Sequence, residues 1–123
     1  MSIIKQPLLF VGSKGEMKLR VVFDKEAKLS LIDGSFITDL ATPVRLGINR
    51  LVNKNGRQNE ITTRVLLEFY CDGRWLSDEF FVVSNFGNKV LIGSPTIRKW
   101  RIKPYFEYDT DIVKPKVAKM QLV

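Results

Sequence analysis

The sequence of 123 residues contains no histidine and a single cysteine, Cys71. Without an imidazole the chain cannot build a Ser-His-Asp or Cys-His nucleophile, a histidine general base, or a zinc site of the usual His/Cys kind. A lone cysteine excludes an intramolecular disulfide, so the composition does not indicate an oxidising compartment. The chemistry that remains for catalysis is that of carboxylates, lysines and hydroxyls.

Long apolar runs are also lacking. No stretch approaches 18 apolar residues, and the N-terminal run is interrupted by Lys5 and Pro7 without a signal-peptide cleavage pattern. We therefore expect a soluble, cytoplasmic protein with no membrane partner. The length and the 45% hydrophobic content fit one domain over residues 1–123.

The net charge of +7 is unevenly distributed. Residues 45–64 and 98–123 each carry a net +4, residues 1–44 carry +1, and residues 65–97 carry −2. Two basic segments could serve a β-barrel that binds single-stranded nucleic acid by stacking bases on exposed rings. We expect the aromatic side chains to form the core instead; these are Trp75, Phe80, Phe81, Trp100, Tyr105 and Phe106. Nucleic acid is therefore not expected to be a partner.

The secondary-structure signals are mostly those of strands. The runs at 17–23 and 28–32, with a turn between them, predict a first hairpin that ends at Asp33. Residues 45–70 predict a long hairpin with a polar, basic tip at 53–59, because Asn55-Gly56 tolerates positive φ. A turn at Asp72-Gly73 and a strand over 75–83 follow.

The last part of the chain carries the clearest helix signal. Residues 89–93 predict a short apolar strand, and Ser94-Pro95 supplies an N-cap with proline at the first helical position. A short helix is therefore expected over 95–100. Residues 105–108 predict a return to β structure, and 114–123 predict a basic tail or an edge strand.

Leu31-Ile32-Asp33-Gly34-Ser35 and Val90-Leu91-Ile92-Gly93 each place a small or acidic residue at the end of an apolar strand. Together with the intervening polar-tipped hairpin, they resemble the retropepsin-like aspartic protease family over about residues 15–113. The resemblance implies an all-β, closed or partly open barrel with one short C-terminal helix, a flap hairpin and a C2 homodimer. In such a dimer, residues 114–123 could supply an interleaved strand.

The resemblance also implies a site. Asp33 of each subunit would form a dyad that activates water against a peptide bond, one carboxyl ionised and the other protonated, because close like charges cannot both ionise. No metal or cofactor is required. Gly34 and Ser35 would shape the active-site loop. The substrate, an extended peptide or unfolded protein, would lie between a flap and a wall. The flap would include Asn55, Gly56 and Arg57, and the wall would be formed by Val90, Leu91, Ile92 and Gly93.

The motif departs from the family pattern Asp-Thr/Ser-Gly. Gly34 stands where the family has a hydroxyl residue and Ser35 where it has glycine; alternatively, one residue is deleted and Gly34 keeps the glycine role. Three hypotheses therefore follow: an aspartic endopeptidase, a degenerate retropepsin-fold dimer that binds peptides without cleaving them, and the nucleic-acid-binding barrel.

Overall fold

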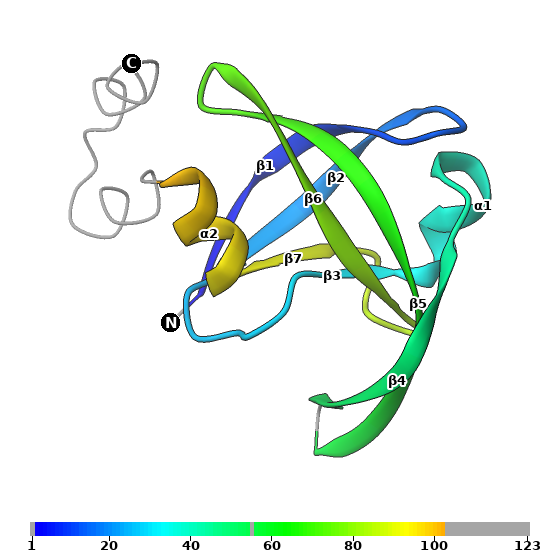
Figure 1. Ribbon diagram of the computed structural model, residues 1–123. Helices are drawn as coiled ribbons and strands as arrows, with labels where there is room; N and C mark the ends of the chain where they lie inside the picture. The colour runs from blue at the N-terminus through cyan, green and yellow to red at the C-terminus, as the bar shows by residue number, and fades with distance from the viewer. Residues whose placement is uncertain (1, 55, 103–123) are drawn as a thin grey trace.

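The computed structural model describes residues 2–54 and 56–102, with side chains described for all of these except residues 2–6, 54 and 57. Within these residues, seven strands and two short helices form one barrel-like body (Figure 1). In chain order the elements are β1 Ser2–Val11, β2 Glu16–Asp24, β3 Leu31–Asp33, a 3-10 turn Gly34–Phe36, α1 Ile37–Leu40, β4 Val44–Lys54, β5 Arg57–Cys71, β6 Arg74–Val83, β7 Val90–Gly93 and α2 Ser94–Trp100.

Six of the strands close into a barrel. Their order is β1-β2-β7-β3-β6-β5, and β1 pairs again with β5 through Phe10 and Phe69 to complete the ring. β4 pairs with β5 outside this ring, so the β4–β5 hairpin projects from the barrel (Figure 1). Closure satisfies the backbone groups of strands that would otherwise be sheet edges.

The barrel interior is packed with aromatic and aliphatic side chains. The alternation of β5 turns Val65, Leu67 and Phe69 inward, whereas Leu66 is 66% exposed. Phe69 stacks on Phe10 at a centroid distance of 5.3 Å. Burial of these apolar side chains is the main stabilising contribution to the barrel.

The predicted hairpin over residues 17–33 is wrong. β2 and β3 do not pair with each other, because β7 lies between them, parallel to β2 and antiparallel to β3. Adjacent β runs joined by a turn favour a local hairpin. Here both strands pair instead with β7, which comes some sixty residues after β3 in the chain.

Three further elements and one side chain were not anticipated. β1 is a full strand despite Pro7, because its register shifts between Lys5 and Leu8 and the missing proline N–H falls in that irregularity. The 3-10 turn and α1 directly after Asp33 were not predicted. Trp75, expected in the core, is 50% exposed and packs edge-to-face against Tyr70.

The other predicted elements are confirmed within the described residues. The 45–70 hairpin is β4–β5, the 72–73 turn has both residues at positive φ (54° for Asp72 and 81° for Gly73), and the helix expected at 95–100 is α2. The N-cap expected at Ser94 is wrong: Gly93 is the N-cap, and the Ser94 side chain makes no capping hydrogen bond. The expectations for 105–108 and 114–123 lie outside the described residues. No helix of the described chain is long and apolar enough to span a membrane.

Candidate functional site

Asp33 is the last residue of β3, at the centre of the barrel wall. β3 lies between β6, to which it is parallel, and β7, and all three of its residues are buried. The strand ends here because the Asp33 side chain caps the following 3-10 turn: the Ser35 N–H donates to Oδ1 over 3.0 Å. The carboxylate is thereby fixed at the point where the chain leaves the sheet.

The loop between β6 and β7 covers the other carboxylate oxygen. The N–H groups of Phe86 and Asn88 donate to Oδ2 of Asp33 over 3.2 and 2.6 Å. Asn85, Gly87 and Asn88 all have positive φ, near 52°, 76° and 50°. These left-handed residues turn the N–H groups of Phe86 and Asn88 toward the carboxylate, and backbone N–H groups arranged in this way bind anions.

The hydrogen bonds determine the charge state of Asp33. Burial by itself raises the pKa of the Asp33 carboxyl, because it penalises the charged form. The hydrogen bonds from the backbone N–H groups of Ser35, Asn88 and Phe86 outweigh burial and hold the pKa below the ordinary 3.8. Asp33 is therefore ionised at neutral pH.

Asp33 itself is only 4% exposed, although Ser35 and Asn88 above it are exposed. The Ser35 hydroxyl donates to Oδ1 of Asn88 over 3.3 Å, so the two segments that cover the carboxylate also contact each other. In this single chain, solvent or substrate would reach Asp33 after displacement of the 84–88 loop.

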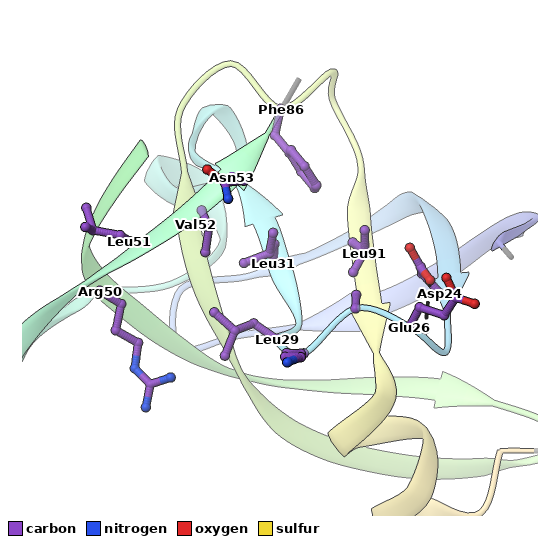
Figure 2. A pocket seen from close by; sticks show the side chains of 12 residues that line it. Asp24, Glu26, Leu29, Leu31, Arg50, Leu51, Val52, Asn53, Phe86 and Leu91 are labelled. Atoms are coloured by element: carbon purple, nitrogen blue, oxygen red, sulfur yellow. Dashed lines mark hydrogen bonds between the residues drawn. The ribbon is translucent and has the colours of Figure 1, made fainter. Parts of the chain in front are cut away.

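A hollow of about 640 Å³ lies between the β4–β5 hairpin and the segment that joins β2 to β3 (Figure 2), and Asp33 is not one of its lining residues. Phe86 links the two features, because its ring lines the hollow and its N–H holds Asp33. The lining residues are Asp24, Glu26, Ala27, Lys28, Leu29, Leu31, Arg50, Leu51, Val52, Asn53, Phe86 and Leu91. The volume falls within the range of small-molecule and peptide side-chain pockets.

The β4–β5 hairpin is anchored by a small hydrophobic cluster of its own. Ile61, fully buried, packs with Leu31, Val83 and Phe86, separately from the barrel core. The hairpin base is therefore fixed to the strand that carries Asp33, whereas its tip extends beyond the barrel (Figure 1).

Comparison with solved structures identifies this architecture. The chain superposes on EIAV protease in complex with the inhibitor HBY-793 with a TM-score of 0.55, at 15% identity over 80% of this chain and 91% of that one. The retroviral protease-like domain of Ddi1 from Leishmania major gives a TM-score of 0.50 at 14% identity, over 79% and 76% of the two chains. The chain has the retropepsin-like fold.

A third likeness concerns a much longer protein. The foamy viral protease-reverse transcriptase in complex with an RNA/DNA hybrid gives a TM-score of 0.53 at 20% identity, over 82% of this chain and 12% of that one. The sequence matches no protein-family model and no curated protein. The retropepsin-like assignment therefore rests on the arrangement of the strands.

The residues of the expected substrate wall divide between two faces of β7. Leu91 lines the hollow, whereas Val90 and Ile92 are fully buried in the barrel core, because successive side chains of a strand face opposite sides. Gly93 lies against backbone: a Cβ there would sit 2.4 Å from the Leu29 carbonyl oxygen. Contact of Leu91 with substrate stays a prediction.

The active-site loop and the hairpin tip are placed as follows. Gly34 and Ser35 form the 3-10 turn after Asp33, and a Cβ on Gly34 would approach its neighbours no closer than 3.4 Å. Gly56 has a φ of 76°, so glycine suits this tip position. Asn55 lies outside the described residues, and so does the side chain of Arg57.

Four further residues belong to the site and were not anticipated: Leu29, Arg50, Phe86 and Asn88. The run Asn85-Phe86-Gly87-Asn88 carries a recognisable signal, because asparagine and glycine are the residues that tolerate positive φ. That this run would bind Asp33 was not visible from the sequence, because the two are more than fifty residues apart.

Proposed function

We propose that this protein is an aspartic endopeptidase that acts as a C2 homodimer, with Asp33 of each subunit forming the catalytic pair. The observation that supports this proposal is the position of Asp33 in the retropepsin-like fold: it is a buried carboxylate at the end of β3, connected to the hollow under the hairpin through Leu31 and Phe86. A peptide in extended form would lie in the hollow, with its backbone against the hairpin strands.

The chemistry needs two carboxyl groups and one water. The ionised carboxylate takes a proton from water as its oxygen attacks the peptide carbonyl, and the protonated partner donates a proton as the amide C–N bond breaks. Two adjacent carboxylates would raise the pKa of one of them, so that the pair shares one proton. This mechanism uses neither histidine nor metal.

Dimerisation would have to change the surroundings of Asp33. Oδ2 already accepts two N–H groups, which fills the acceptor capacity of one carboxylate oxygen. For Oδ2 to hold a water or a partner carboxyl, the 84–88 loop must release at least one of these bonds. We propose that assembly of the dimer around substrate brings about this release.

A second candidate follows from the same bonds. A carboxylate whose oxygens are held by three N–H groups of its own chain can serve as a structural anchor. In that case the retropepsin-like fold would bind extended peptides without cleaving them.

The test combines cleavage, assembly and binding. An unstructured protein is incubated with the purified chain between pH 3 and 7, with and without a statine-type inhibitor, while sedimentation reports the oligomeric state. We expect cleavage that tracks the dimer and is lost in Asp33→Asn, but is kept in Asp39→Asn, which changes an exposed aspartate in the next helical turn. Peptide binding without cleavage at any pH would overturn the first candidate and support the second.

A further inference from the structure

The hollow beneath the hairpin is apolar in its middle and charged at its margins. Leu29, Leu31, Val52, Phe86 and Leu91 supply the apolar lining, and Phe86 and Leu31 are buried. Four charged side chains also line it, two of each sign: Asp24, Glu26, Lys28 and Arg50. Their formal charges cancel, so the hollow as a whole attracts neither acidic nor basic molecules.

The charges are nevertheless separated in space. Figure 2 shows Arg50 on one side of the hollow and Asp24 and Glu26 on the opposite side, with leucine side chains between them. Arg50 comes from the hairpin strand β4, whereas Asp24 is the last residue of β2 and Glu26 lies two residues after it. A segment that crosses the hollow would meet Arg50 at one end and two carboxylates at the other, where Lys28, two residues after Glu26, offsets part of their charge.

Arg50 is placed to contact a ligand. Its side chain is exposed, and its guanidinium carbon lies 5.2 Å from the centre of the Phe81 ring, which orients the group by a cation–π contact. The ion pairs described for the chain use other side chains, Arg64 with Glu79 and Lys99 with Asp78. A planar guanidinium held by a ring favours a carboxylate partner.

We infer that the hollow selects peptide segments of mixed charge, in which a large apolar side chain is flanked by an acidic residue that contacts Arg50 and by a basic residue at the Asp24–Glu26 end. This inference rests on the proposed peptide-binding function and adds a substrate class to it. The apolar residue supplies most of the affinity by burial, and the two charges select the sequence.

The test uses four fluorescent pentapeptides with the same Leu-Phe-Leu centre. Their outer residues are Glu and Lys, two Glu, two Lys or two Gln, and binding is measured by anisotropy at pH 7, with peptide integrity checked by mass spectrometry. We expect the mixed-charge peptide to bind roughly two- to fivefold tighter than the Gln peptide, the scale of exposed ion pairs. The preference should shrink in 0.5 M salt, because screening weakens exposed pairs.

Charge reversal then assigns the preference to the hollow. Arg50→Glu should make the Lys–Lys peptide the tightest of the four, and Glu26→Lys should favour the Glu–Glu peptide relative to wild type. Arg45→Glu and Glu16→Lys are matched controls: both residues are exposed and neither lines the hollow, so the order of preference should not change.

Each outcome separates the inference from the endopeptidase proposal. A charge preference in binding supports the inference whether or not the peptides are cleaved, because cleavage of an unstructured protein between pH 3 and 7 tests the endopeptidase separately. Binding that is indifferent to the four peptides, or that is unchanged by Arg50→Glu, overturns the inference and leaves the endopeptidase standing. Absence of binding by every peptide also overturns the inference, and the endopeptidase is then decided by the cleavage assay alone.

Discussion

The N–H of Asn88 donates to Oδ2 of Asp33 over 2.6 Å, joining two residues 55 positions apart in the sequence. The bond connects the end of β3 to the loop that leads into β7. The same carboxylate binds Ser35 through its other oxygen, so one side chain holds together three segments of the barrel wall. Several properties of the protein depend on this connection.

The first is the response of stability to acid. The pKa of Asp33 is below 3.8 in the folded chain and near 3.8 when the chain unfolds. The unfolded state therefore takes up the proton first as the pH falls. The stabilisation by Asp33 is fully present above the unfolded value, near pH 4, and is lost as the pH falls through the lowered folded value.

Urea unfolding at pH 7 and at pH 3 measures this effect. Asp33→Asn should be less stable than wild type at pH 7 by about 1–3 kcal/mol, because an amide nitrogen would face N–H donors. The further loss of stability between pH 7 and pH 3 should be smaller in Asp33→Asn than in wild type. An identical pH dependence in the two proteins would show that Asp33 does not carry the linkage.

Backbone conformation at Asn88 gives a second prediction. Its φ of 50° is tolerated by asparagine and glycine but costs more for a residue such as valine. Asn88→Gly keeps the N–H that binds Asp33, so its stability should stay within about 0.5 kcal/mol of wild type. Asn88→Val should lose about 1–3 kcal/mol, as measured by denaturant unfolding; equal stabilities would contradict this account.

Substitution by alanine should lower the stability at one glycine near the site and leave it nearly unchanged at another. A Cβ on Gly93 would lie 2.4 Å from the Leu29 carbonyl oxygen and 2.9 Å from that of Ala27, both backbone atoms. Gly93→Ala should therefore destabilise by roughly 1–3 kcal/mol or more. Gly34→Ala meets no atom closer than 3.4 Å and should change stability by less than about 1 kcal/mol. Thermal melts of both variants measure the loss of stability. A large loss in Gly34→Ala and none in Gly93→Ala would contradict the packing described.

A buried hydroxyl pair gives the fourth prediction. Ser30 and Thr96 lie 2.7 Å apart between their hydroxyl oxygens, and the Gly93 N–H donates to the Ser30 oxygen over 3.0 Å. These bonds tie the segment before β3 to the start of α2. Thr96→Val keeps the shape but removes the hydroxyl, and should cost about 1–2 kcal/mol.

Thr38→Val is the matched control for Thr96→Val, because Thr38 is exposed. Urea unfolding should show little change there. A cost at Thr38 equal to that at Thr96 would mean that the threonine-to-valine exchange itself, rather than the buried pair, sets the loss.

Local signals in the sequence predicted a large part of the fold. The sequence marks two hairpin turns and a helix start, and the structure has the β4–β5 and β5–β6 hairpins and begins α2 at Ser94, because turn and helix-start preferences act between neighbouring residues. The predicted N-cap is one residue out, because Gly93 occupies the cap position and Ser94 is already helical. The 3-10 turn and α1 after Asp33 were not predicted, because these elements are too short to show the hydrophobic periodicity of a helix.

The candidate site was predicted in part. Asp33 was identified as a candidate because it lies at the end of a predicted apolar strand. In the structure it is the last residue of β3 and is buried. Its role in catalysis stays a prediction. Arg50 and Phe86 lie on the hairpin and the β6–β7 loop, so their approach to one hollow depends on contacts that no local pattern encodes.

What the sequence alone determined about this protein is its alternation, its turns and the chemistry it cannot perform without histidine. Tertiary structure decided which strands pair: β7 separates β2 from β3, β1 closes on β5, and the 84–88 loop folds onto Asp33. The reason is physical. Turn and cap preferences are settled between neighbours in the chain, whereas strand order and the partners of a buried carboxylate are settled by which arrangement buries the apolar faces and satisfies every polar group at once.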